Sequence, residues 1–286
     1  MQMQFEELAG GFTFLEAPRV DEDDNLYFSD VVLGNLYRRS PAGEVETLLT
    51  DRKWLGGIAL TDGGVVCSGQ GNLLHLDLKT RKTRLLVEEI DGRPILSIND
   101  IQPDAHGSIY CGVIDIKSLA AGQPPTDGYL FRIDPDGRAT KLASGISISN
   151  GMGFSPDGGL LYHADTFVGV WVYELGTDRG IRSRRMFAPI KDCDGLTVDA
   201  EGGVWVAACQ SGEIVRYSPD GAVERRHRFP MAEIMSLTFG GKDLRDLYVV
   251  TASPNATNMK PNAGGEGKIL RARSDIPGQR TPLARF

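Results

Sequence analysis

The sequence predicts an all-β fold, a six-bladed β-propeller with four antiparallel strands in each blade. One unit recurs six times: an apolar strand, a turn rich in Asp, Gly or Asn, a second strand around an aromatic or aliphatic residue, and two more strands. A repeat of four strands every ~40 to 50 residues is typical of propeller blades. The central residues of the second strands, separated by 39, 44, 52, 43 and 43 residues, are Tyr27, Val66, Tyr110, Tyr162, Trp205 and Tyr248.

Turn residues mark the boundaries of these strands. The first turns of the six units fall at 21–25, 61–64, 103–107, 155–159, 199–203 and 240–246. The third strands follow at 35–39, 72–78, 128–134, 169–175, 212–218 and 267–273. Turns at fixed offsets between alternating apolar and polar residues are typical of β-hairpins. A β-sandwich would have similar short strands, but it would not repeat this turn chemistry six times.

We therefore expect residues 1–286 to form a single six-bladed propeller domain. A closed ring needs one end of the chain to complete the last blade, because open sheet edges would otherwise remain. Both 4–10 and 280–286 have a suitable sequence, and the sequence does not choose between them.

Composition narrows the classes of partner. The 286 residues are 41% hydrophobic, enough for a sizeable core. The net charge is −7, with acids and bases interleaved and no basic stripe, which argues against a nucleic acid or an anionic membrane as partner. Residues 1–12 lack the pattern of a secretory signal, and no apolar run approaches the ~18 residues of a membrane span. The four cysteines and four histidines are dispersed, so we expect reduced thiols in a cytoplasmic protein and no zinc cluster.

Four polar residues occupy matching places at the start of four first strands. Each lies eleven or twelve residues before its second-strand anchor, and they are Glu16, Asn99, Asn150 and Asp194. The first strand of each blade lines the central channel, so these side chains would meet at one mouth of it, with Leu55 and Met235 at the same place in the other two blades. Two carboxylates and two amides favour a divalent cation such as Ca²⁺, Mg²⁺ or Mn²⁺, and zinc is less natural without His or Cys. The alternative is that these residues only hydrogen-bond water in the channel.

Several segments together resemble a known family. They are Glu16-Ala17-Pro18, Asn99-Asp100, Ser149-Asn150-Gly151, Phe154-Ser155-Pro156-Asp157-Gly158, Asp194-Gly195-Leu196 and 239–252. In this order they resemble the signature segments of the gluconolactonase family, which includes regucalcin and the luciferin-regenerating enzymes. The resemblance covers nearly the whole chain.

The resemblance implies hydrolysis of a small-molecule lactone, typically a sugar lactone, at one divalent metal ion. Its ligands would be Glu16, Asn150 and Asp194, while Asn99 contacts the substrate. We expect Ca²⁺, with Mg²⁺, Mn²⁺, Zn²⁺ or Fe²⁺ as alternatives. The ion would polarise the lactone carbonyl and activate water, and Asp194 would act as ligand and general base. The sequence leaves the oligomeric state open.

The chain departs from the family pattern at two places, of which the first concerns the substrate and the second is a small change. Ser97 stands where several members have a sugar-binding arginine, and Ala17 stands where the first motif usually has glycine. Apolar residues expected around the mouth are Phe14, Trp54, Leu55, Met152, Phe167 and Met235. They predict a substrate less hydroxylated than an aldonolactone, unless they merely pack between blades.

The predicted substrate contacts are Asn99, Ser97, Trp54 and Asp115. Asp115 and Lys117 begin an insertion at 114–128 that would form a lid over the mouth.

Three further residues are expected to be structural. Asp165 would cap a turn, His163 would lie within a strand, and Asp100 would point to the face of its strand opposite Asn99.

Three other functions use the same fold and stay open at this point. A phosphotriesterase-type hydrolase would place a carboxylate against phosphorus at the same metal site. A non-catalytic calcium-binding propeller would hold an ion or a partner at the mouth. Isomerisation or ring opening would also use a polarised carbonyl.

Overall fold

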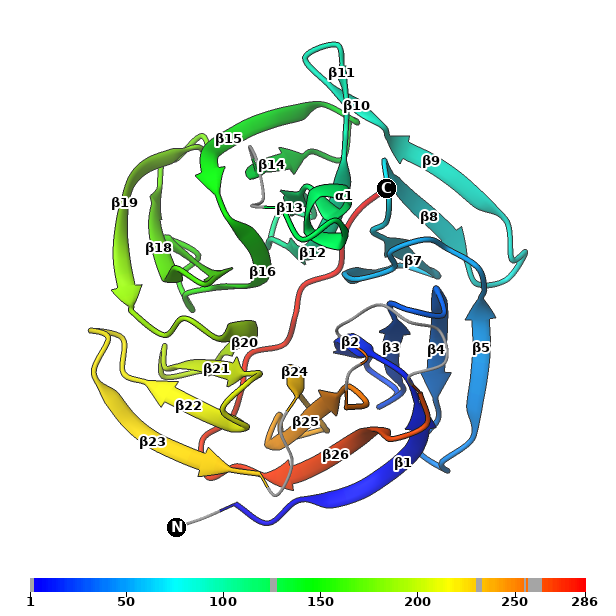
Figure 1. Ribbon diagram of the computed structural model, residues 1–286, viewed down its shortest axis with the longest axis vertical. Helices are drawn as coiled ribbons and strands as arrows, with labels where there is room; N and C mark the ends of the chain where they lie inside the picture. Colours follow the sequence, from blue (N-terminus) through cyan, green and yellow to red (C-terminus); the bar gives the residue numbers. More distant parts are fainter. Residues whose placement is uncertain (1–2, 124–127, 230–232, 255, 257–263) are drawn as a thin grey trace.

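The computed structural model describes residues 3–123, 128–229, 233–254, 256 and 264–286. Six four-stranded antiparallel sheets lie as blades around a central axis (Figure 1). The innermost strands contact one another in sequence around the axis, and the last contacts the first. The predicted six-bladed propeller is therefore confirmed.

The first three blades follow the chain from the inner strand to the outer one. Blade 1 consists of β2 (Leu15–Val20), β3 (Leu26–Asp30), β4 (Asn35–Arg39) and β5 (Val45–Leu49). Blade 2 consists of β6 (Ile58–Thr61), β7 (Gly64–Cys67), β8 (Leu73–Asp77) and β9 (Thr83–Val87). Blade 3 consists of β12 (Ser97–Pro103), β13 (Ile109–Ile114), β14 (Gly128–Ile133) and β15 (Ala139–Ile146).

The second half of the ring repeats this order, except in its last blade. Blade 4 consists of β16 (Ile148–Phe154), β17 (Leu160–Thr166), β18 (Gly169–Leu175) and β19 (Ile181–Ala188). Blade 5 consists of β20 (Cys193–Val198), β21 (Val204–Ala208), β22 (Glu213–Tyr217) and β23 (Val223–Arg228). Blade 6 consists of β24 (Ile234–Gly240), β25 (Asp246–Thr251), β26 (Gly267–Arg273) and β1 (Glu6–Phe12). Three short elements lie outside the blades: β10 (Glu89–Ile90), β11 (Arg93–Pro94) and α1 (Ile116–Ala120).

The N-terminal strand closes the ring. β1 pairs antiparallel with β26, from Glu6 opposite Arg271 to Phe12 opposite Gly267. Exposed ion pairs from Arg271 to Glu6 and from Lys268 to Glu7 run along the same seam. The choice between the two chain ends, which the sequence left open, is thus decided for residues 6–12.

The C-terminal segment crosses the end of the channel opposite the predicted mouth. Its backbone hydrogen bonds reach Leu244 in blade 6, Ala200 in blade 5, Leu60 in blade 2 and Gly107 in blade 3. Residues 279–282 also line a cavity of about 460 Å³ at this end of the channel. The segment therefore links several blades at the end of the channel opposite the predicted mouth. Figure 1 shows it in red passing the centre of the ring.

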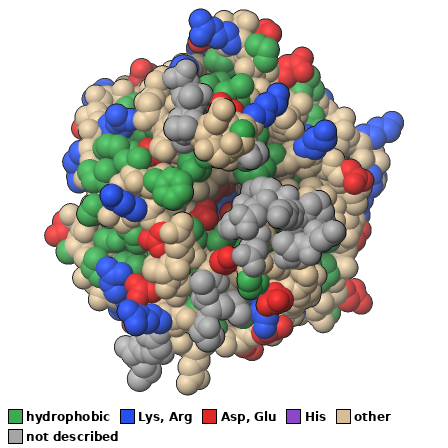
Figure 2. Space-filling model, viewed as in Figure 1, with side chains coloured by type: hydrophobic (Ala, Val, Ile, Leu, Met, Phe, Trp, Pro, Cys, Tyr) green, Lys and Arg blue, Asp and Glu red, His purple; other side chains and the backbone are tan. Residues whose placement is uncertain are grey.

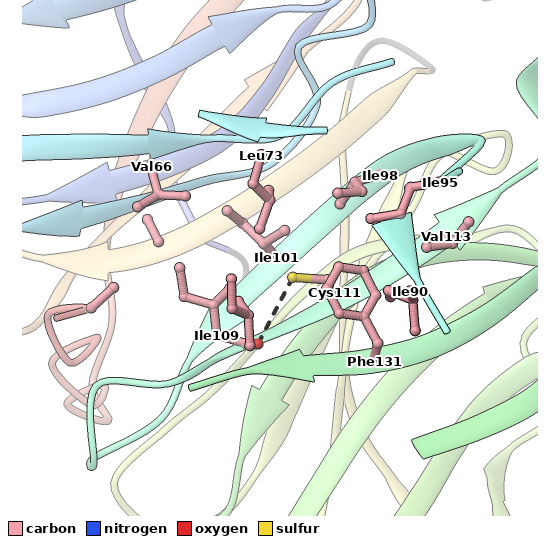
Figure 3. Packing of buried hydrophobic residues seen from close by; sticks show 13 residues of the cluster. Val66, Leu73, Ile90, Ile95, Ile98, Ile101, Ile109, Cys111, Val113 and Phe131 are labelled. Atoms are coloured by element: carbon pink, nitrogen blue, oxygen red, sulfur yellow. Dashed lines mark hydrogen bonds between the residues drawn. The ribbon is translucent and has the colours of Figure 1, made fainter. Parts of the chain in front are cut away.

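Apolar side chains fill the spaces between neighbouring blades. Figure 3 shows the cluster between blades 2 and 3, where Val66 and Leu73 face Ile98, Ile101 and Cys111. The outermost strands are the most exposed: β19 at the outer edge of blade 4 is largely exposed, whereas the innermost strand of blade 6, β24, is wholly buried. The blade interfaces therefore hold most of the core.

Small residues let the innermost strands approach closely beside the mouth. A Cβ atom on Gly151 in β16 would lie 2.2 Å from the backbone nitrogen of Leu196 in β20. Backbone atoms cannot turn aside as a side chain can, so only glycine fits here without moving a strand.

We predict that Gly151→Ala lowers the free energy of unfolding by about 1–3 kcal/mol, the usual range for overpacking. The control is Gly159→Ala, whose Cβ would meet nothing nearer than Asp157 Oδ1 at 3.5 Å. Urea unfolding of both variants measures the difference. Equal stability of the two variants would contradict the close approach of β16 and β20.

Candidate metal and substrate site

β-bulges direct the predicted ring residues into the channel. In β12, β16 and β20, two residues oppose one on the neighbouring strand, and the first of each pair is Asn99, Asn150 or Asp194. In β2, Glu16 directly precedes the corresponding pair. A bulge breaks the strict alternation of a strand and re-aims its side chains, so the same irregularity recurs where the four oxygen-bearing side chains are needed.

The bulge of blade 1 places a non-glycine residue in a left-handed backbone conformation. Ala17 has φ +46°. This conformation is easier for glycine and costs an alanine roughly 1 kcal/mol. Ala17, which replaces the glycine usual in the family, therefore lies at a position where the backbone conformation favours glycine.

A chain of hydrogen bonds orients the two amides. Asn99 Nδ2 donates to Asn150 Oδ1 at 2.6 Å and to Ser149 O at 2.8 Å. Asn150 Nδ2 donates to Thr166 Oγ1 at 2.7 Å, and that hydroxyl donates to Cys193 O at 2.7 Å. Both N–H groups of Asn99 are thus in use, and its Oδ1 accepts no hydrogen bond from the described residues. The Asn150 oxygen keeps a second lone pair for a ligand.

The carboxylates of the ring lie close together in a poorly solvated place. Asp194 is 8% exposed and Glu16 is partly buried. Burial, then the charges of Asp194 and Asp100, raise the pKa of Glu16 well above its ordinary value. Burial and the charge of Asp100 likewise raise the pKa of Asp194, against a hydrogen bond from Cys209 that lowers it. Ionised carboxylates in such a place need a cation beside them.

These residues fit a hard divalent ion by the chemistry of their donors. Glu16, Asp194 and the Asn150 amide offer oxygen, the ligand atom that Ca²⁺ and Mg²⁺ prefer. No group of three or more His, Cys, Asp or Glu side chains suited to a metal occurs in the described part of the chain, so an amide oxygen would have to complete the ligand set. Figure 2 shows acidic side chains within the central hollow of this face.

The four predicted substrate contacts differ in their surroundings. Asn99 lies on the ring, and Trp54 is partly buried against the apolar cluster that contains Phe14 and Met235. The Nε1 atom of Trp54 is buried and has no hydrogen-bond partner among the described residues. Ser97 is fully buried and donates to Leu96 O at 2.9 Å. Asp115 caps α1 by accepting from Ser118 N and Oγ. As substrate contacts all four stay predictions.

Most of the expected apolar rim is interior instead. Leu55, Met152 and Met235 are at most 2% exposed and pack between blades, so they add no surface at the mouth. Phe167 is 56% exposed. The inference of a less hydroxylated substrate therefore loses most of its basis. Of the insertion at 114–128, residues 124–127 lie outside the described residues.

The structure corrects the expectation for Asp100. Strand alternation placed it on the face opposite Asn99, but the bulge brings its carboxylate to the channel, 4.0 Å from Arg19 of blade 1. Thr166 and Cys209 also belong to the site and were missed. Thr166 is the last residue of the second strand of blade 4, and Cys209 directly follows the second strand of blade 5, where the sequence carries no repeated signal.

His163 and Asp165 have the structural roles expected of them. Asp165 accepts hydrogen bonds from Ser147 N, Ile148 N and Trp171 Nε1. His163 is fully buried, and its Nε2 lies 2.8 Å from Ser149 Oγ.

Comparison with known proteins agrees with this fold and shows the family of the chain. Residues 14–253 match the protein-family model described as the SMP-30/Gluconolactonase/LRE-like region, and the chain belongs to this family. It is 30% identical over 267 residues to a 6-deoxy-6-sulfogluconolactonase of Pseudomonas putida, covering 90% of each protein. It is 29% identical over 254 residues to the pentonolactonase XacC of Haloferax volcanii, covering 86% of this chain and 82% of that one.

A solved structure shares the same architecture. A luciferin-regenerating enzyme superposes with a TM-score of 0.87 over 99% of this chain and 100% of its own, at 22% identity. In the described residues, no helix has the length and apolar character needed to cross a membrane.

We predict a pH dependence of stability from His163. Burial lowers its pKa from 6.5 to about 3, so below pH ~6.5 the unfolded chain takes up a proton that the folded protein excludes. Stability is therefore lost as the pH falls from about 6.5 toward 3, by about 2 kcal/mol at pH ~5.

Urea unfolding at pH ~7.5 and ~5 measures this loss. The control is His163→Gln, which removes this titration and leaves all other groups in place. An equal loss in both proteins would show that His163 does not cause it.

Proposed function

We propose that the protein is a metal-dependent lactonase that opens a sugar lactone or a related small lactone at the mouth of the propeller. The observation that carries this proposal is the pair of crowded carboxylates, Glu16 and Asp194, beside the oriented amide of Asn150. Membership of the family supports it. The two relatives named above support it too, because both names describe lactonases of sugar acids.

Glu16, Asn150 and Asp194 would hold one divalent cation, with Ca²⁺ as the first choice. When bound, such an ion polarises a carbonyl oxygen and lowers the pKa of water. Thr166 holds the Asn150 amide by accepting from its Nδ2, so that Oδ1 faces the ligand position. Outer partners of this kind commonly matter for affinity because they fix the ligand orientation.

Asp194 is proposed as the general base. A carboxylate oxygen of Asp194 would accept the proton of the attacking water and later release it to the leaving hydroxyl of the opened ring. Its burial makes it a stronger base than an exposed aspartate. The Cys209 thiol, which donates to it, restricts its orientation.

Asn99 and Trp54 are proposed to bind the substrate with complementary groups. Both N–H groups of Asn99 are engaged, so its Oδ1 would accept a hydrogen bond from a substrate hydroxyl. The Nε1–H of Trp54, which has no partner in the part of the chain that the structure describes, would donate to a substrate oxygen. This pairing favours a lactone that carries hydroxyl groups, because a buried polar group left unpaired lowers affinity.

We predict that Asp194→Asn lowers kcat/KM for lactones by at least about 10³-fold, because it removes the base and weakens the metal site. Asp157→Asn is the control, since Asp157 lies in an exposed turn and asparagine can keep its hydrogen bonds. Near-normal turnover by the Asp194 variant would refute its role as base.

A lactone panel measured after chelation tests the whole proposal. We expect hydrolysis to fall to background without metal and to return when Ca²⁺ or another single divalent ion is added. Turnover that is unaffected by chelation would contradict metal dependence. Paraoxon cleavage without lactonase activity would favour a phosphotriesterase, and Ca²⁺ binding without any turnover would favour a non-catalytic propeller.

A further inference from the structure

We propose that Arg19 and Asp100 form a buried charge pair that sets the ionic charge of the metal accepted at the mouth. This inference rests on the proposed metal site and concerns two residues that do not themselves bind the ion. They are positioning residues, which act on the metal site through the electric field of their own charges.

Arg19 lies in the channel below Glu16, three residues further along β2. Its side chain is 8% exposed. It donates to Pro18 O at 2.9 Å, Ile101 O at 3.0 Å and Gln102 Oε1 at 3.3 Å. Its Nε is buried and has no hydrogen-bond partner among the described residues. A guanidinium keeps its charge in such a place because its pKa is so high, so it is a fixed positive charge inside the channel.

Asp100 links this guanidinium to the carboxylates above it. One of its oxygens accepts from Ile101 N at 2.9 Å and lies 4.0 Å from Arg19 Nη2. Its side chain is 12% exposed. Its charge acts on both Glu16 and Asp194. Of the described residues, Asp100 is therefore the one in contact with Arg19 whose charge reaches both carboxylates of the site.

The charges of this group match a divalent ion. When ionised, the carboxylates of Glu16, Asp194 and Asp100 carry three negative charges, and Arg19 carries one positive charge. The group is left with two negative charges, which a divalent ion neutralises. Charges interact strongly where water is excluded, so a mismatch of one unit is costly.

A purely structural role for the pair makes a different prediction. Arg19 ties blade 1 to the backbone of blade 3 through Ile101, and losing that tie would lower stability. It would not change which ion is preferred. Ion preference and the behaviour of a charge-balanced double variant therefore separate the two roles.

The test measures Ca²⁺ and Tb³⁺ affinity of the whole protein by calorimetry and terbium luminescence. Asp100→Asn leaves one negative charge and should weaken Ca²⁺ binding by at least about ten-fold, as loss of an outer partner commonly does. Arg19→Met leaves three negative charges and should shift the preference toward Tb³⁺ over Ca²⁺ by about ten-fold or more. The double variant restores two negative charges and should return both affinities to within about three-fold of wild type.

The double variant and Asp100→Asn keep the test valid if Arg19→Met does not fold, because neither leaves a buried carboxylate without its partner. The matched control is the buried pair Arg132–Asp134, joined at 2.8 Å with both side chains 5% exposed. Arg132→Met and Asp134→Asn should leave both ion affinities unchanged.

Two results would overturn the inference in distinguishable ways. If wild type binds Ca²⁺ but the double variant is no closer to it than Asp100→Asn is, the pair does not act by charge. If wild type binds no divalent ion, the proposed function itself fails and the inference fails with it.

Discussion

The pairing of β1 with β26 is the constraint on which the site depends. It joins residues some 260 positions apart in the chain and closes the ring. Only two residues separate β1 from β2, so closure of the ring also fixes the position of Glu16, the second residue of β2. Glu16 then lies close enough to Asp194 of blade 5 for that charge to act on it. In an open array the first blade would be free to move away from the others, and no four blades would share an axis.

Repetition explains how much of this could be predicted from the sequence. Turn chemistry and strand period are local signals, and six copies of them identify both the fold and the equivalent positions of Glu16, Asn99, Asn150 and Asp194. The positions of Asp100 and Arg19 could not be found this way. They depend on a bulge that breaks alternation in β12 and on a contact between blades 1 and 3, and neither leaves a local pattern.

The sequence also cannot say which atom of a side chain remains free. Asn99 was expected to contact the substrate, and the structure adds that hydrogen bonds to Ser149 O and Asn150 Oδ1 use both of its N–H groups. For Leu55 and Met235, too, the sequence indicates the position in the ring but not the direction of the side chain. Their positions in the ring are equivalent to those of the polar residues, yet both are fully buried, because an apolar side chain at a ring position packs between blades.

Several unfavourable local features lie at the mouth of the propeller. Ala17, Trp54 and Phe167 all have positive φ values, and for the two bulky aromatic residues this backbone is rare. Two carboxylates lie together where burial opposes their charge, and one tryptophan N–H has no partner among the described residues. None of these features stabilises the fold. They persist because the surrounding blade interfaces are extensive and well packed, and strained or unpaired groups of this kind are common where a protein binds a ligand. A cation between Glu16 and Asp194 would offset the repulsion of the two buried carboxylates. An oxygen-rich substrate beside Trp54 would supply a hydrogen-bond acceptor for its N–H group.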